Sequence, residues 1–259
     1  MQVQRRFSPR ERVVISLAGL TGVSILLFFA GAIANRSLQF DYLLWNLFLA
    51  WLPLGIVAML VRNLRLNIWS SWQPLSLTLL WLVLLPNSFY MISDFVHIQD
   101  VARHNLLYDV VIFTAFIFTA ALLGFSSLYI VHTELRKRMN LRDSSIAVAV
   151  ILFLCGFAIY LGRDLRWNSW DVLLNPAGIL FDISDHLIHP LQNGEMISTT
   201  FSFFVLLGSL YLVGWQLGEA TRQEGQLDVP YSRRTVSEFI PTWSSVRDAV
   251  GLRQKDKRP

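Results

Sequence analysis

The chain has 259 residues, of which 54% are hydrophobic and only 15% are Asp, Glu, Lys or Arg. Soluble domains carry about 25% charged residues, so this composition excludes an ordinary water-soluble protein. The net charge is +4, but the basic residues flank apolar blocks, which indicates orientation in a membrane and not binding to nucleic acid. The single cysteine, Cys155, excludes an intrachain disulfide and says nothing about the redox compartment.

Six apolar blocks are each long enough to cross a hydrocarbon core of about 30 Å as an α-helix. None of them contains Asp, Glu, Lys, Arg or His. Helices are the expected form because lipid offers no hydrogen-bond partner to backbone amides. We therefore predict an all-α polytopic membrane protein with six transmembrane helices, embedded in a lipid bilayer. The predicted spans are residues 13–34, 42–61, 75–93, 110–131, 144–162 and 197–217.

The distribution of Lys and Arg predicts that both termini are cytoplasmic. In that orientation 18 of the 22 basic residues lie in cytoplasmic segments and four lie in outer loops, as the positive-inside rule requires. Residues 1–218 then form the membrane domain and residues 219–259 a basic cytoplasmic tail. Near its end, Trp243, Val246 and Val250 recur at helical spacing. A short helix on the anionic inner leaflet and a disordered tail both fit this segment.

Two alternative topologies have to be compared with the six-span prediction. A seventh span over residues 173–191 would bury two aspartates and two histidines and would place the basic tail outside, so it is disfavoured. Arg5, Arg6 and the apolar run that ends at 32–34 resemble a secretory signal. That run has 22 residues, longer than a signal core of roughly 7–15, so we predict a retained first span. Cleavage would leave five spans with the same sidedness.

Polar residues gather where spans three and four reach the outer side. On a helix, four of them fall within roughly 80° of one another, and Pro86 should loosen the helix above them. Asp109 opens span four at the same depth. These candidate site residues are Asn87, Tyr90, Asp94, His97 and Asp109.

A second polar segment follows span five. Its two arginines among several aspartates suggest a clamp for phosphate or carboxylate, and its Trp residues suit the membrane interface. A belt of interfacial anchors with salt bridges explains the same pattern equally well. The candidate residues are Arg163, Arg166, Asn168, Trp170 and Asp171.

An amphipathic helix is predicted over residues 178–189, lying flat on the outer leaflet. Its polar side carries Asp182, Asp185, His186 and His189. Asp and His at this spacing also suit a metal ion, although a solvated polar face is the favoured interpretation.

Together these elements predict one outward-facing polar site at the membrane interface. It would bind a small polar or lipid-headgroup ligand, or hydrolyse it with a water bound to a divalent metal ion. The candidate metal ligands are Asp94, His97, Asp109, His186 and His189. A facilitative transporter or channel and a non-catalytic scaffold or assembly subunit remain alternatives. A proton-coupled pump is disfavoured because no span carries a charge at its midplane. The sequence does not indicate an oligomeric state.

Several of these motifs resemble domain of unknown function 1361, a family of multi-span bacterial membrane proteins. The similar segment covers roughly residues 75–218, and its most specific part is Asn168–Asp171. The family has no established activity, so the resemblance implies a bacterial plasma-membrane location and motif residues clustered on one side, without naming a reaction. The other matching positions are Leu85-Pro86-Asn87, Tyr90, Asp94, His97, Tyr108-Asp109, Gly124, Ser127-Leu128, His132 and Tyr160-Leu161-Gly162-Arg163.

Overall fold

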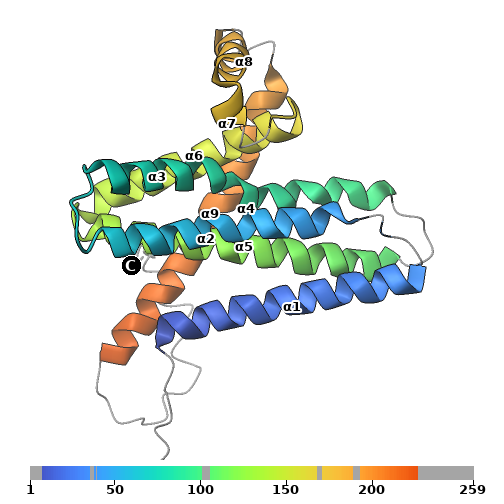
Figure 1. The fold of residues 1–259 in the computed structure, drawn as a ribbon, viewed down its shortest axis with the longest axis horizontal. Coiled ribbons are helices and arrows are strands. Elements are labelled where there is room, and N and C mark those ends of the chain that lie inside the picture. The colour runs from blue at the N-terminus through green and yellow to red at the C-terminus, as the bar shows by residue number, and fades with distance from the viewer. Residues whose placement is uncertain are drawn as a thin grey trace, which may run out of the picture. The chain divides into compact units, whose positions relative to one another are not determined.

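The computed structural model describes residues 8–35, 38, 40–100, 106–167, 171–188 and 193–226. Throughout these residues every regular element is a helix (Figure 1). In chain order the helices are α1 (Pro9–Asn35), α2 (Tyr42–Asn63), α3 (Trp72–Leu84), α4 (Pro86–Tyr90), the 3₁₀-helix η1 (Met91–Asp100), α5 (Leu106–Arg136), α6 (Leu141–Arg163), α7 (Asp171–Leu174), α8 (Pro176–Ile188) and α9 (Gly194–Gln226).

Six helical stretches are long and apolar enough to cross a membrane, which confirms the predicted all-α fold with six spans. Most of the helices run a few residues beyond the predicted spans, because backbone hydrogen bonding continues where the hydrocarbon core ends. The six stretches are Glu11–Ala34, Tyr42–Asn63, Trp72–Val96, Leu106–Arg136, Leu141–Arg163 and Gly194–Thr221.

The chain divides into two compact units, Met1–Val213 and Gly214–Pro259. The first contains α1 to α8 and most of α9. The described part of the second is the remainder of α9. The helix predicted near Trp243 lies outside the described residues, and the predicted domain boundary at residue 218 stays a prediction.

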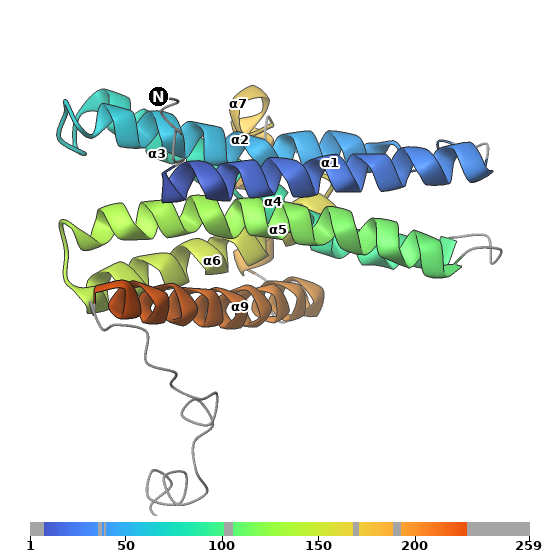
Figure 2. The same cartoon turned by 90° about the horizontal axis from the view of Figure 1, so that it is seen from below.

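Helix α5 is the centre of the first unit, and α1 and α2 run alongside it (Figures 1 and 2). Their common core contains Leu47, Phe113 and Phe116. Polar side chains also join these helices: the hydroxyls of Ser24 and Thr119 lie 3.0 Å apart in a fully buried contact. Such hydrogen bonds hold helices together in lipid, where apolar contact alone distinguishes poorly between partners.

The third span is broken at Pro86, which has no backbone N–H and starts α4 after a one-residue turn at Leu85. The Asn87 amide donates to the Leu84 carbonyl at 3.1 Å, and the Ser88 hydroxyl donates to the Ala50 carbonyl of α2 at 3.1 Å. Local side chains therefore supply hydrogen bonds at a break that lipid could not hydrate. Beyond it the chain tightens into η1, so Asp94 follows a 3₁₀ and not an α-helical course.

The first unit has a cavity end and a loop end. The cavity end contains the start of α2, helix η1 and the end of α6. The loop end contains the turns at residues 64–71 and 137–140, which lie together at one end of the helices (Figure 2).

Candidate functional site

A cavity of about 870 Å³ opens between α2, α4 and α6 and extends to α7 and α8. Its size falls in the upper part of the range for small-molecule sites, roughly 300–1,000 Å³. Helix α4 packs against both α2 and α6, so α4 forms the floor and the other two helices form walls. Helices α7 and α8 follow the end of α6 and contribute the remaining side (Figure 1).

Along α2, α3 and α4 the lining of this cavity changes from polar to apolar, and the end of α6 with α7 and α8 adds further apolar side chains beside the polar residues. The polar lining residues near the start of α2, along α4 and in η1 are Asn46, Asn87, Tyr90 and Asp94. Further toward the middle of the spans the lining is aliphatic and aromatic. These deeper lining residues are Leu49, Leu82, Val83, Leu154, Phe157 and Ala158.

Asp94 is the acidic group of the polar end and is only 3% exposed. Its Oδ2 accepts a hydrogen bond from Nδ2 of Asn46 on α2, at 3.2 Å. A buried carboxylate is costly unless donors surround it, so this contact between two spans helps to keep the acid inside. Asn46 was not among the predicted site residues. Its signal was present, because Asn46 is the one amide side chain in the second predicted span.

Tyr90 lies near charges of both signs. The charges of Asp94, Arg163 and Asp164 all act on its hydroxyl. Gly162 allows this approach, because a Cβ there would lie 3.3 Å from Cε2 of Tyr90. The ends of the third and fifth spans are thus adjacent.

The segment after α6 returns to the cavity through an unusual backbone conformation. Arg166 has φ 59°, in the left-handed region that favours glycine. This bend lets the Trp167 N–H donate to the Leu161 carbonyl at 3.1 Å, and the Trp167 ring lines the cavity. Its Nε1 donates to Oδ2 of Asp182 at 2.8 Å, which ties α8 to the end of α6.

Helix α8 turns its apolar residues toward the cavity, since Ile179, Leu180 and Ile183 line it. Gly178 lies against Trp167, because a Cβ at that position would be 2.9 Å from Cη2 of the ring. The amphipathic helix predicted from the sequence therefore spans Pro176–Ile188, and part of its apolar side faces protein. Its placement on a leaflet stays a prediction.

The end of α6 also carries Asp164, outside the spanning segment. Burial raises the pKa of this carboxyl, Arg163 opposes that change, and Glu195 at the start of α9 adds to it. The polar surface beside the cavity thus contains both signs of charge.

The predicted site residues fall into three groups. Asn87, Tyr90 and Asp94 line the cavity. Asp109, Arg163, Arg166 and Asp171 are described but are not part of its lining; Asp109 is buried on α5. Asn168 and Trp170 lie outside the described residues, as do the side chains of Asp185 and of the three candidate histidines, His97, His186 and His189.

Across the described residues there is no group of three or more His, Cys, Asp or Glu side chains that could hold a metal ion. Three of the five candidate ligands, His97, His186 and His189, fall outside that set. The metal site therefore stays a prediction.

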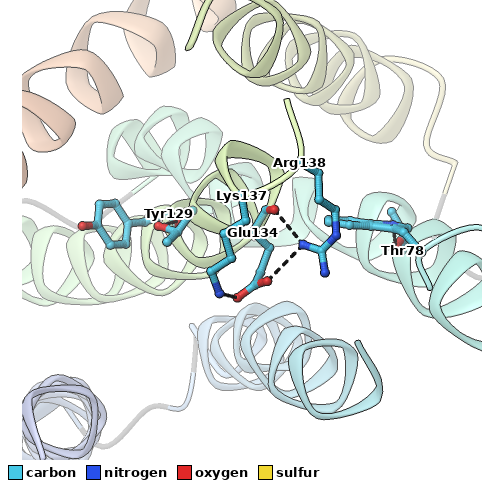
Figure 3. Close-up of polar contacts among 7 residues, drawn as sticks. Thr78, Tyr129, Glu134, Lys137 and Arg138 are labelled. Carbon is cyan, nitrogen blue, oxygen red and sulfur yellow. Dashed lines mark hydrogen bonds and ion pairs between the residues drawn. The ribbon is translucent and has the colours of Figure 1, made fainter. Parts of the chain in front are cut away.

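A second polar cluster lies at the loop end (Figure 3). Glu134, which is 5% exposed, pairs with Lys137 and with Nη1 of Arg138, the latter at 3.2 Å. The Arg138 guanidinium lies 5.1 Å from the centroid of the Trp69 ring, and Nε1 of Trp69 donates to the Thr78 hydroxyl at 2.9 Å. We call Trp69, Thr78, Glu134, Lys137 and Arg138 the loop-end cluster.

These features define a multi-pass α-helical membrane protein with a cavity in which a few polar side chains gather within a largely apolar lining. Residues 45–210 match the family described as protein of unknown function (DUF1361). The match covers more than half of the chain, so the chain belongs to this family, as the resemblance predicted. No curated protein and no solved structure matches it.

Proposed function

We propose that this protein binds one amphiphilic molecule of the membrane in the cavity. The headgroup lies at Asn46, Tyr90 and Asp94, and the hydrocarbon chain lies along Leu49, Val83 and Leu154. The observation that carries this proposal is the change in lining along α2, α3 and α4 from amides and a carboxylate to aliphatic side chains within a single cavity. An amphiphile has the same order of polarity along its length.

The headgroup end supplies the selectivity. A hydrocarbon chain that moves from the bilayer to the aliphatic side of the cavity passes from one apolar environment to another. This transfer contributes little free energy of binding. Hydrogen bonds to a carboxylate in a poorly hydrated site are stronger than in water, and a mismatched headgroup leaves polar groups unsatisfied. Affinity for one headgroup over another therefore depends mainly on Asp94 and its neighbours.

The cavity end faces outward in the proposed topology, and both termini are cytoplasmic. This orientation rests on the distribution of Lys and Arg along the sequence, 18 in the segments predicted to be cytoplasmic against four in the predicted outer loops. With the family's implied location in a bacterial plasma membrane, the ligand comes from the outer leaflet. Labelling of single cysteines near Asp100 and near Arg138, in a Cys155→Ser background, tests this: only the first should react in intact cells.

A substitution that fills the cavity tests the binding proposal. Ala158 lines the cavity, so Ala158→Phe should remove bound lipid. Val150→Phe is the matched control on the same helix, because Val150 is 52% exposed on the outside of the structure. Delipidated protein in detergent is mixed with phosphatidylethanolamine and phosphatidylglycerol, and bound lipid is counted by native mass spectrometry. Equal retention by both variants would refute the proposal.

Hydrolysis of the bound ligand with a metal ion is a further step, and it depends on the histidines. Loss of a true metal ligand costs metal affinity roughly 10- to 100-fold. Purified wild type should then carry stoichiometric zinc or manganese, melt earlier in chelator, and lose that response in His97→Ala, His186→Ala or His189→Ala. Metal-free wild type with three variants that melt like it would leave binding as the whole function.

A further inference from the structure

Helices α7 and α8 cover one side of the cavity as a pair. Among the described helices, α8 packs mainly against α7. Asn175 fixes the turn between them: its Oδ1 accepts a hydrogen bond from the Gly178 N–H at 3.1 Å, and its own N–H donates to the Asp171 carbonyl at 2.8 Å. The α7–α8 pair is therefore a small unit of its own beside the spans.

The α7–α8 pair closes its side of the cavity only in part. Ile179 is 8% exposed, but Leu180, the next residue, also lines the cavity and is 65% exposed. The floor helix α4, in contrast, packs against α2, α5 and α6. An element with few buried contacts separates from its surroundings at a lower free energy than a core element does. Of the described walls, the α7–α8 pair should therefore open most readily.

Trp167 joins the α7–α8 pair to the end of α6. Its backbone N–H donates to the Leu161 carbonyl at 3.1 Å, and its Nε1 donates to Oδ2 of Asp182 on α8 at 2.8 Å. The edge of its ring lies against Gly178, where a Cβ would be 2.9 Å from Cη2. The same ring lines the cavity, so one side chain belongs both to the cavity wall and to the attachment of α8.

The backbone directly before Trp167 is strained. Arg166 has φ 59°, a conformation that is unfavourable for a residue with a Cβ. Such a conformation persists only where surrounding contacts hold it, and the contacts of Trp167 with Leu161 and Asp182 do so here. Separation of Trp167 from Asp182 would let Arg166 relax, so the strain lowers the cost of opening.

We infer that the α7–α8 pair is a lid, and that the hydrogen bond from Trp167 to Asp182 holds it on the cavity and limits the exchange of ligand. The identity of what passes the lid rests on the proposed function: the amphiphile enters and leaves while Asp182 is separated from Trp167. Trp167 and Asp182 are positioning residues in this scheme, because they act through the placement of α8.

The first test measures the lid without a ligand, in delipidated full-length Cys155→Ser protein in detergent. Ile183→Cys places a thiol on the cavity side of α8, and Ser184→Cys places one at an exposed position of the same helix. Trp167→Phe keeps an aromatic ring but loses a hydrogen bond to a carboxylate, so maleimide should label Ile183→Cys about tenfold faster. Labelling of Ser184→Cys should not change. Trp72→Phe, the same substitution at an exposed position, is the matched control and should leave both rates as they are.

The acceptor provides an independent pair of variants. Asp182→Leu cannot accept from Trp167 and should accelerate labelling of Ile183→Cys as Trp167→Phe does. Asp182→Asn keeps an acceptor oxygen and should stay close to the wild-type rate.

The second test measures ligand exchange. Asp182 is described but is not part of the cavity lining, so Asp182→Leu leaves the side chains that face the ligand in place. Native mass spectrometry follows the replacement of bound phosphatidylethanolamine by its deuterated form. We expect Asp182→Leu to exchange lipid about tenfold faster with little change in the amount bound, because a lid that opens more often speeds entry and exit alike. A wall that only supports the cavity would instead lower the amount bound.

The outcomes separate this inference from the proposed function. Labelling of Ile183→Cys that neither Trp167→Phe nor Asp182→Leu accelerates overturns the lid, whatever the protein binds. Faster labelling with unchanged lipid exchange overturns the control of ligand exchange by the lid. Equal lipid retention by Ala158→Phe and Val150→Phe overturns the proposed function and with it the role of the lid in lipid exchange, whereas the labelling rates still decide whether the lid opens.

Discussion

The two polar regions of this protein use similar residue types in different ways. At the loop end, Glu134 pairs with Lys137 and Arg138, three and four residues further along the chain. At the cavity end, Asp94 accepts from Asn46, 48 residues away on another span. The first cluster satisfies its charge locally and fixes a turn. The second places a buried acid at the wall of a cavity large enough for a ligand.

This difference distinguishes the loop-end cluster, which stabilises the fold, from the cavity, which is a candidate binding site. Charges that are neutralised by near neighbours in sequence contribute to the stability of the fold. A buried acid in the wall of a cavity that is large enough for a ligand is instead a candidate binding group. Substitutions at the loop end should therefore change stability, and substitutions at the cavity end should change binding.

The largest effect on stability is expected where α4, the floor of the cavity, packs against α5. A Cβ at Gly124 would lie 2.8 Å from Cβ of Ser88 and 2.9 Å from the ring of Phe89, and both residues are fully buried. Gly124→Ala should cost about 1–3 kcal/mol through overpacking, measured by thermal unfolding in detergent. Gly55→Ala is the control, because its Cβ would meet nothing within 4 Å. A Gly124→Ala protein as stable as Gly55→Ala would show that the floor is loosely packed.

The loop-end cluster should respond next. Glu134→Gln keeps the shape of the side chain but removes the charge that Lys137 and Arg138 share, at an expected cost of about 1 kcal/mol. Lipid retention should be unchanged, because this cluster is distinct from the cavity lining. Arg142→Gln, at an exposed cation of the same end, should have less effect. A change in lipid binding by Glu134→Gln would contradict the separation of the two regions.

A smaller effect is expected from the Trp69 ring. Trp69→Phe keeps an aromatic face beneath Arg138 but removes the donor to Thr78 and weakens the cation–π contact, which should cost about 0.5–1 kcal/mol. The exposed Trp72, 79% accessible, is the control, and Trp72→Phe should leave the melting temperature almost unchanged. Equal melting temperatures of the two variants would show that Trp69 does not contribute to the stability of the loop-end cluster.

The smallest effect concerns Asp164 beside the cavity. Its pKa is raised in the folded protein, so the folded state disfavours the ionised form. The free energy of unfolding therefore falls as the pH rises from the ordinary pKa of the carboxyl through the raised one. Asp164→Asn should therefore stabilise the protein at pH 7 by no more than about 0.5 kcal/mol. The gain should vanish below about pH 3, because an unfolded aspartate with a pKa of about 3.9 is then mostly protonated, as the folded one is. Melting curves across this range decide the sign, and a destabilised variant at pH 7 would show that the favourable charge of Arg163 outweighs burial.

Much of the polar end of the cavity was visible in the sequence. Asn87, Tyr90 and Asp94 recur at spacings that keep them on one side of a helix, and the 3₁₀ course after Met91 still leaves Tyr90 and Asp94 on the cavity. Asn46 was missed because a single amide in an apolar span does not indicate its partner. The contribution of Ile179, Leu180 and Ile183 was missed because an apolar helix side fits a lipid surface as well as a protein wall.

The sequence by itself determined the six spans and their all-helical form, since about 20 uncharged residues in lipid have no other way to satisfy their backbone. It did not determine which side of each span faces its neighbours. Lipid chains and a protein interior are equally apolar, so the spans lack the polar-to-apolar contrast that orients helices in water. Only the tertiary structure brought Asn46 to Asp94, Gly162 to Tyr90 and Trp167 to Asp182, and those three contacts between distant segments shape the cavity.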